Sequence, residues 1–147
     1  MQVTGILDSI KESVTTMTGL DPSFVDDIDK RLQSLAYTLQ KGEDWAVNFT
    51  IQSVTNTIKS NCNTTAIPEG LYNIAINMVC GEFLATKKAL GQLSDAQMQS
   101  TIKSIEEGDT KITYADEKSL NSLFDTLMNN LRAGSASEFV RYRRLLW

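Results

Sequence analysis

The chain has 147 residues, of which 41% are hydrophobic and 22% are charged, values that fit one soluble globular domain with a single core. Its formal net charge is −4, which makes it a poor candidate for general binding to nucleic-acid phosphates. The absence of histidine excludes His-based catalytic triads and His-containing metal sites, and it removes the side chain best suited to proton transfer near neutral pH.

The N-terminus and the two cysteines indicate the compartment. Residues 1–20 are polar and contain no apolar signal-peptide core, and no run of about 20 apolar residues could span a membrane. We therefore expect a protein made and kept in a cytoplasm, or in a particle assembled there, with no membrane partner. Cys62 and Cys80 match no zinc-binding pattern, so we expect two buried thiols and neither a metal nor a cofactor.

The first half of the chain predicts three helices. A weak apolar pattern over 1–19 indicates a peripheral helix that packs on the domain or on a neighbour. Residues 21–42 place apolar side chains on one stripe, and Gly42 ends that helix. A helix over 43–60 follows. The apolar positions of these two helices are Phe24, Ile28, Leu32, Leu35 and Leu39, then Trp45, Val47, Ile51, Val54 and Ile58.

The second half predicts a central helix, a hairpin and a final helix. Residues 71–90 are apolar nearly all round, which is typical of a buried helix, and Gly81 would allow a close helix crossing. Two short β-prone runs around a Gly–Asp turn predict a β-hairpin over about 102–114. A final helix runs from Asp116 to Gly134.

The predicted hairpin is a candidate contact between subunits. Two strands alone are only marginally stable, and their free edges invite pairing with another chain. It could equally be an ordinary surface ribbon. The residues that would make the inter-subunit contact are Ile102, Ile105, Ile112 and Tyr114.

We therefore expect a mainly α protein, a small bundle of four or five helices with a short β-hairpin insertion and an extended C-terminal tail. The helical domain covers 1–134 and the tail covers 135–147. Large aromatic and basic residues end the chain, where sequences are usually polar, and such residues are enriched at binding hot spots. We interpret the tail as a docking segment, although it could fold back onto its own domain or contact nucleic acid. Its candidate residues are Phe139, Arg141, Tyr142, Arg143, Arg144, Leu145, Leu146 and Trp147.

An acidic cluster near the start has two interpretations. Asp26, Asp27 and Asp29 would favour the positive end of a helix dipole. They could also form a negative surface that repels passing DNA.

Four segments, in order, resemble the small head–tail connector proteins of long-tailed bacteriophages, also called head-completion or DNA-packaging adaptors. Residues 44–63 look like the second helix of that family, and residues 67–83 look like its loop and central helix. Residues 102–114 look like its hairpin, and residues 141–147, Arg-Tyr-Arg-Arg-Leu-Leu-Trp, look like its C-terminal signature.

The resemblance implies a structural role in the virion, at the head–tail interface, assembled in the host cytoplasm. Such proteins form a ring of about twelve copies below the portal. Their C-terminal segments dock on the portal protein, and the other side of the ring receives the next neck or tail-completion protein. Double-stranded DNA passes through the channel without specific binding. The family has no known catalysis and needs no cofactor.

Two other functions remain open from the residues alone. A small helical DNA-binding or regulatory protein would need a basic recognition helix, and none of the predicted helices has one. An enzyme that uses carboxylates, with or without a metal, would need converging acidic side chains, for which Glu106 and Asp109 are the candidates.

Overall fold

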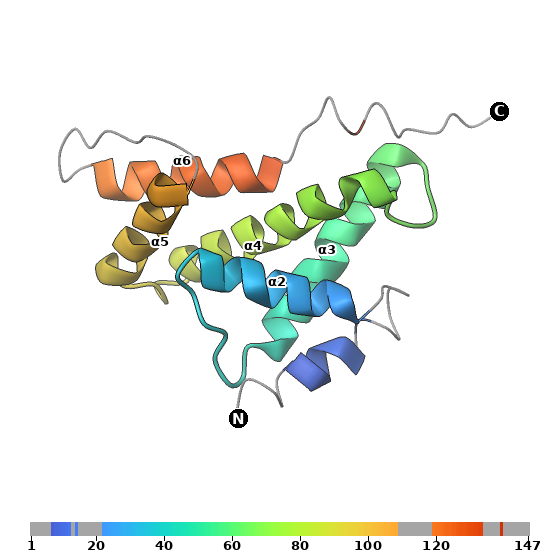
Figure 1. Cartoon of the computed structure of the whole chain (residues 1–147), viewed down its shortest axis with the longest axis horizontal. Coiled ribbons are helices and arrows are strands. Elements are labelled where there is room, and N and C mark those ends of the chain that lie inside the picture. Colours follow the sequence, from blue (N-terminus) through green and yellow to red (C-terminus); the bar gives the residue numbers. More distant parts are fainter. Residues whose placement is uncertain (1–6, 13, 15–21, 109–118, 134–138, 140–147) are drawn as a thin grey trace.

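A computed structural model describes residues 7–12, 14, 22–108, 119–133 and 139, with only the backbone for 106–108 and 119. All regular structure within these ranges is helical, as Figure 1 shows, so the mainly α class is confirmed. A short helical segment at 7–12 comes first. The elements that follow are α2 (Ser23–Ser34), α3 (Asp44–Cys62), the 3-10 turn η1 (Glu69–Leu71), α4 (Tyr72–Ala89), α5 (Asp95–Gly108) and α6 (Ser119–Ala133).

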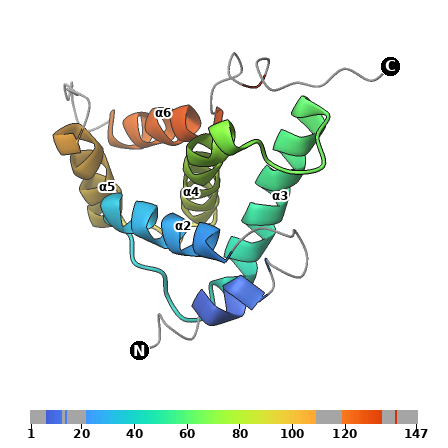
Figure 2. The ribbon, with the colours of Figure 1, turned by 45° about the vertical axis from the view of Figure 1, so that its right-hand side comes forward.

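Helix α4 is the centre of the fold, as its apolar composition predicted. It packs against α2, α3 and α6, which surround it in Figure 2, while α5 packs against α6. Apolar side chains on several faces of α4 are buried by these neighbours. Its buried residues are Ala75, Ile76, Met78, Val79, Cys80, Gly81, Phe83 and Leu84.

Gly81 lets α4 and α6 cross closely, which confirms the prediction for this residue. A Cβ atom added at Gly81 would lie 2.7 Å from the Cβ of Leu131 and 3.0 Å from the carbonyl oxygen of Met128. Two backbones this close exclude any side chain at the crossing, because real Cβ atoms do not approach others at 2.7 Å.

Helix α2 ends at Ser34, well before the predicted end at Gly42. Ala36 takes a left-handed conformation with φ 66°. Its N–H donates to the Gln33 carbonyl at 2.9 Å, and the next N–H, that of Tyr37, donates to the Leu32 carbonyl at 2.9 Å. This pair of bonds closes a helix terminus in the manner of a Schellman motif.

The residues after this terminus are nevertheless part of the core. Tyr37 and Leu39 are buried, whereas Thr38 and Gln40 between and after them are exposed. This alternation is the period of an extended chain, not of a helix. Leu39 was predicted as an apolar position of the helix over 21–42, and this helical setting is wrong, although the residue is buried.

The predicted hairpin over 102–114 is wrong where the structure describes it, because α5 continues as a helix to Gly108. At the start of this helix, the Gln97 N–H donates a hydrogen bond to the Ser94 hydroxyl oxygen at 3.1 Å, which caps the helix. Met98 and Ile102 are buried four residues apart and Ile105 packs against the core three residues later. This helical spacing outweighs the β-branched composition. Ile112 and Tyr114 lie outside the described residues.

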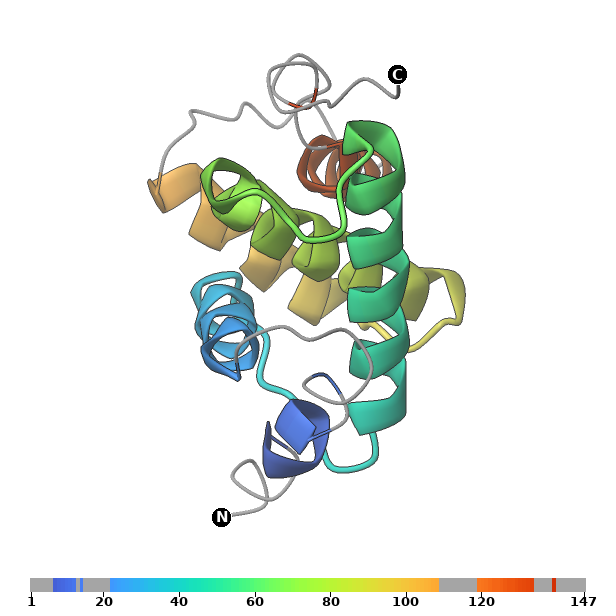
Figure 3. The same ribbon diagram turned by 90° about the vertical axis from the view of Figure 1, so that its right-hand side faces the viewer.

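The helical segment at 7–12 packs on the domain, one of the two outcomes predicted for it. Ile10 is completely buried, and Val14 just beyond is 2% exposed. The Ser9 hydroxyl donates to the Asp44 carboxylate at 3.0 Å, which holds the segment near the N-terminal end of α3 (Figure 3).

Both cysteines are buried and free, as predicted. They lie on different helices, Cys62 at the end of α3 and Cys80 within α4. Burial raises the pKa of the Cys80 thiol to about 12, so this group stays protonated and packs as a small apolar residue.

Candidate interaction surface

In the described part of the chain, three large hydrophobic side chains are exposed, and they lie together. Trp45 is 72% exposed, Phe49 58% and Leu90 65%. The rings of Trp45 and Phe49 stack with centroids 5.3 Å apart and planes 9° from parallel. Contiguous apolar surface of this kind marks interaction sites more often than isolated exposed residues do.

Trp45 was predicted as one of the apolar positions of the helix over 43–60, but it does not lie with the others, and helix geometry gives the reason. The other apolar positions, Val47, Ile51, Val54 and Ile58, are all buried. Trp45 and Phe49 are four residues apart, so they share one face of the helix, and that face points away from the core. Apolar character without the right spacing did not place Trp45 inside.

The three exposed residues line an open groove between the first half of α3 and the C-terminal end of α4. One wall carries Trp45, Ala46 and Phe49, and the other carries Phe83, Thr86 and Leu90. We call this the aromatic groove. Its lining is mostly hydrophobic and aromatic, which is typical of sites that receive side chains of a partner.

A buried polar cluster lies at one side of the aromatic groove. The Glu43 carboxylate accepts hydrogen bonds from the Tyr37 hydroxyl at 2.6 Å and from the Gln40 backbone N–H at 2.6 Å. It also forms an ion pair with the Lys87 ammonium. The Lys87 nitrogen also lies 5.9 Å from the ring centroids of Tyr37 and Phe83. Every charge in the cluster is thus matched by a neighbour, as a buried ion pair requires.

The chemistry of this cluster is structural. Burial raises the pKa of the Tyr37 phenol above its ordinary value, and the hydrogen bond to Glu43 raises it further. Tyr37 is therefore a constant hydrogen-bond donor at physiological pH. The contacts of Glu43 connect the extended segment before α3 to the C-terminal half of α4, and so fix the two walls of the groove relative to each other.

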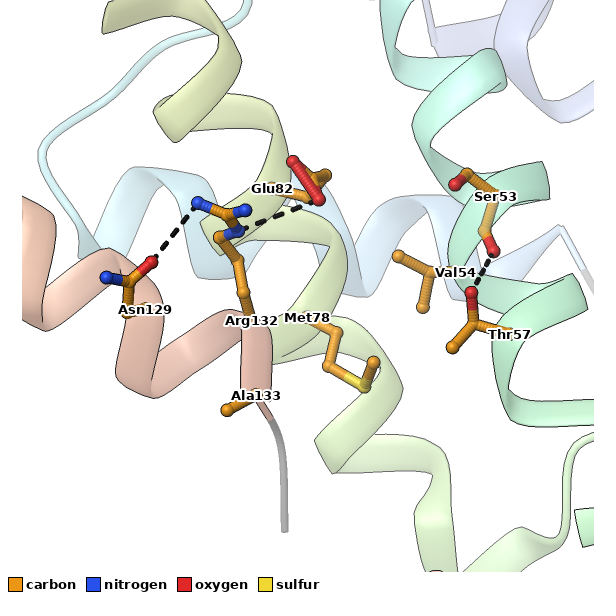
Figure 4. A pocket seen from close by; sticks show the side chains of 8 residues that line it. All are labelled: Ser53, Val54, Thr57, Met78, Glu82, Asn129, Arg132 and Ala133. Carbon is orange, nitrogen blue, oxygen red and sulfur yellow. Dashed lines mark hydrogen bonds and ion pairs between the residues drawn. The ribbon is translucent and has the colours of Figure 1, made fainter. Parts of the chain in front are cut away.

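A second, more polar groove adjoins the first and involves α6. Figure 4 shows its lining from α3, α4 and the end of α6, with Arg132 reaching toward Glu82. The Arg132 Nε lies 3.6 Å from the Glu82 carboxylate, and its Nη1 donates to the Asn129 side chain at 3.2 Å. We call this the polar groove. Ser53 and Glu82 line both grooves, so the two form one continuous surface.

The residues predicted for portal binding fall almost entirely outside the described ranges. Phe139 is the exception: it is half-buried and packs against the hydrophobic core. The Cys62 thiol donates a weak hydrogen bond to the Phe139 carbonyl oxygen at 3.8 Å. At this residue the chain folds back onto its own domain, which was the alternative for the tail. The other predicted residues lie outside the described ranges: Arg141, Tyr142, Arg143, Arg144, Leu145, Leu146 and Trp147.

Of the residues predicted for an inter-subunit hairpin, the two that the structure describes are not available as a strand edge. Ile102 is completely buried in α5, and Ile105 packs partly buried against the core. Their side chains support the domain itself.

The acidic residues near the start do not form one negative surface. Asp29 is buried, and its Oδ2 accepts the Gln33 side-chain amide at 2.9 Å while Oδ1 has no partner. Asp26 pairs with Lys11 at 2.9 Å, and Asp27 is exposed. Burial raises the pKa of the Asp29 carboxyl above its ordinary 3.8. The helix-dipole interpretation fits Asp26, which lies in the first turn of α2.

The described residues contain neither a candidate metal site nor a candidate membrane span. No group of three or more Cys, Asp and Glu side chains there could hold a metal ion. No helix in those same ranges is long and apolar enough to cross a membrane. The candidates for carboxylate chemistry, the Glu106 side chain and Asp109, lie outside the part of the chain that the structure describes.

Comparison with protein-family models, with curated proteins and with solved structures found no match to this chain. The fold and the surface therefore have to be interpreted on their own. They define a small helical protein whose most distinctive feature is an open aromatic groove.

Sequence reasoning missed the aromatic groove, although a signal for its α3 wall was present. Trp45 and Phe49 are one helical turn apart and are out of phase with the buried positions of α3, which identifies a second apolar face. The polar cluster gave no such signal, because Lys87 is 44 residues from Glu43 in the sequence.

Proposed function

We propose that this protein is a structural adaptor of the neck of a tailed bacteriophage. In this proposal it forms a ring of about twelve copies below the portal, joins head to tail and extends the DNA channel, with no catalytic role. The observation that carries the proposal is the aromatic groove on the outside of a well-packed helical domain. The resemblance of residues 44–63, 67–83 and 141–147 to head–tail connectors supplies the identity of the assembly. Residues 102–108, which resembled the hairpin of that family, are helical and give no support.

The energy available at the groove is appropriate for an assembly contact. A large aromatic side chain presents about 150–250 Å², and burial of apolar surface contributes about 25 cal/mol per Å². Covering the three exposed side chains would therefore contribute several kcal/mol per subunit. Repetition of that contact around a closed ring makes the whole assembly much stronger than one contact.

A ring also needs two different faces on each subunit, because its interfaces are heterologous. The aromatic groove supports one of these faces, the one that receives a neighbour. The C-terminal residues from Phe139 to Trp147 carry the arginines and aromatic side chains suited to the portal contact. The net charge of −4 suits a channel through which DNA slides without being held.

The test is reconstitution with a portal ring purified from the phage or phage-derived particle whose genome encodes this chain. We expect the full chain to cosediment with portals and to add a ring visible by electron microscopy. Deletion of 140–147 should leave a helical protein that no longer cosediments. A chain that neither binds portals nor forms rings would show that the proposal is wrong.

A matched pair of variants separates the groove from general surface charge. Trp45→Asp combined with Phe49→Asp places two charges in the groove, and we expect it to prevent ring closure. Gln99→Asp combined with Ser100→Asp places the same charges on the exposed face of α5, and we expect normal rings. Equal behaviour of the two variants would remove the groove from the interface.

A further inference from the structure

The outer face of α3 continues the aromatic groove as an uncharged surface along one side of the domain (Figure 3). We propose that two copies of this chain associate through this surface, with their α3 helices antiparallel across a two-fold axis. The association concerns the isolated protein and does not depend on the ring.

The outer face of α3 carries no charge over three helical turns. Residues 45–58 contain no charged side chain, whereas 22% of the whole chain is charged. Trp45, Phe49, Ser53 and Asn56 are exposed and follow one another at spacings of three or four residues, so they share one face of the helix. We call this the neutral face. Interfaces are depleted of charged residues at their core, so this composition is typical of a surface that a partner covers.

The charges that border the neutral face are already paired. Glu43 forms an ion pair with Lys87, and Glu82 forms one with Arg132. The other polar residues that line the aromatic groove are uncharged. A strongly charged partner would therefore find no free counter-charge here. A second copy fits better, because a two-fold axis places a surface against itself, and like charges would meet there unless the surface were neutral.

The exposed aromatic pair and the groove beside it are complementary in shape. The aromatic groove has a volume of about 480 Å³, within the range of pockets that enclose a whole small ligand, so it has room for the aromatic rings of another copy. In the part of the chain that the structure describes, the three large exposed hydrophobic residues all lie at this groove. A second copy thus offers matching apolar surface at its own groove, which makes the contact symmetric.

The area of the contact is appropriate for a weak dimer. Large aromatic side chains present about 150–250 Å² each, so Trp45, Phe49 and Leu90, at 72%, 58% and 65% exposure, expose roughly 400 Å² per copy. Two copies would cover about 800 Å², and the rest of the neutral face brings the total to about 1,000 Å². Specific interfaces begin near this size, so we expect reversible association with a dissociation constant in the micromolar range or weaker.

Pairing of this kind would cover the apolar surface of free subunits. The same groove receives the neighbouring subunit in the ring, so a dimer has to open before its two subunits can enter a ring. Free subunits would then not close rings without a portal. This consequence, unlike the association itself, rests on the proposed function.

Sedimentation equilibrium of the full chain tests the association without portals. From about 1 µM to about 1 mM, we expect the mean mass to rise from that of one chain toward that of two and no further. Trp45→Asp with Phe49→Asp should weaken the association about 100-fold or more, because it places charges at the centre of the contact. Gln99→Asp with Ser100→Asp, on the exposed face of α5, should associate as the unchanged chain does.

Two results of the sedimentation experiment would overturn the proposal. A chain that stays monomeric over the whole range does not pair through any surface. Growth beyond two copies would show that the contact is heterologous, because a two-fold contact closes at the dimer.

The dependence on salt separates a neutral contact from ion pairing. Each copy carries a net charge of −4, and salt screens the repulsion between the copies. Raising NaCl from about 0.05 M to about 0.5 M should therefore leave the association unchanged or strengthen it about twofold. Weakening by salt would mean that ion pairs hold the copies together and that the neutral face is not the contact.

Crosslinking tests the two-fold symmetry. Ser53 is exposed near the middle of the neutral face, so in an antiparallel pair it lies close to Ser53 of the other copy. We expect Ser53→Cys to give crosslinked dimers with a short bismaleimide, because the two native cysteines are buried and react little. Gln99→Cys on α5 is the control and should stay largely uncrosslinked. Equal crosslinking of the two variants, or none with Ser53→Cys, would contradict the two-fold contact, whatever the outcome with portals.

Discussion

Helix α4 has two stretches that meet their neighbours in opposite ways. Around Gly81 it is pressed so closely against α6 that a single Cβ atom would lie 2.7 Å from Leu131. From Phe83 to its C-cap residue Leu90 it forms one wall of the aromatic groove, where Leu90 is 65% exposed. The same helix thus closes the core at one stretch and leaves apolar surface open at the other. Open apolar surface of this kind is typical of interaction sites, which is what the proposed function requires of it.

The largest effect on stability is expected where the groove meets the polar cluster. Lys87→Met leaves the buried Glu43 carboxylate without its cation, and we expect it to lower the free energy of unfolding by about 3 kcal/mol. Chemical denaturation monitored by circular dichroism measures the loss. The neighbouring Lys88 pairs with Asp125 at 2.7 Å, but the Asp125 side chain is 56% exposed. Lys88→Met should therefore cost less than about 1 kcal/mol, and equal losses would contradict the structural role of Glu43.

The close crossing of α4 and α6 comes next. Gly81→Ala gains about 1 kcal/mol of helix propensity, but overpacking typically costs about 1–3 kcal/mol. The obstructing atoms are the Leu131 Cβ and the Met128 carbonyl oxygen, which move only with the backbone, so we expect a net loss of about 1–2 kcal/mol. Ser122→Ala on the exposed face of α6 is the control. A stabilised Gly81→Ala protein would show that the helices are not in close contact.

Substitutions in the aromatic groove should, unlike Gly81→Ala, leave the stability of the fold nearly unchanged. Trp45→Ala with Phe49→Ala removes two large side chains, yet we expect the free energy of unfolding to change by less than about 1 kcal/mol, because both are mostly exposed. Thermal melting measures this directly. A loss of several kcal/mol would mean that the aromatic pair supports the fold, and the interaction role of the groove would have to be abandoned.

The smallest effect concerns pH and Asp29, away from the groove. Burial raises the pKa of this carboxyl in the folded state above its ordinary 3.8. At a pH between the ordinary pKa and the raised pKa of the folded state, the folded protein binds more protons than the unfolded one. The free energy of unfolding therefore decreases as the pH rises through this range. Asp29→Asn lacks this dependence on pH, so the denaturation midpoint of the variant should rise relative to that of the wild type as pH increases from about 4. A constant difference would contradict the raised pKa.

Periodicity predicted most of the helical framework because burial and helix geometry coincide there. The buried positions of α3 and the nearly all-round burial of α4 follow directly from their apolar spacing. Gly81 was identifiable because a glycine within a strongly apolar helix usually has a packing reason.

Other parts depended on contacts between distant residues. In α5, β-branched isoleucines suggested strands, whereas their burial against the helical core selected a helix. The end of α2 is set by the left-handed Ala36, and alanine gives no sign of that conformation. Glu43 and Lys87 are 44 residues apart, so their pairing could not be predicted from local pattern.

The contacts of Glu43 have a thermodynamic consequence for whatever enters the aromatic groove. Tyr37, Gln40 and Lys87 already hold its surroundings in one arrangement, so the receptor loses little conformational entropy on binding. The entropic cost falls on the incoming partner instead. Affinity should then be adjustable from the partner alone, because a stiffer partner gives up less freedom when it binds.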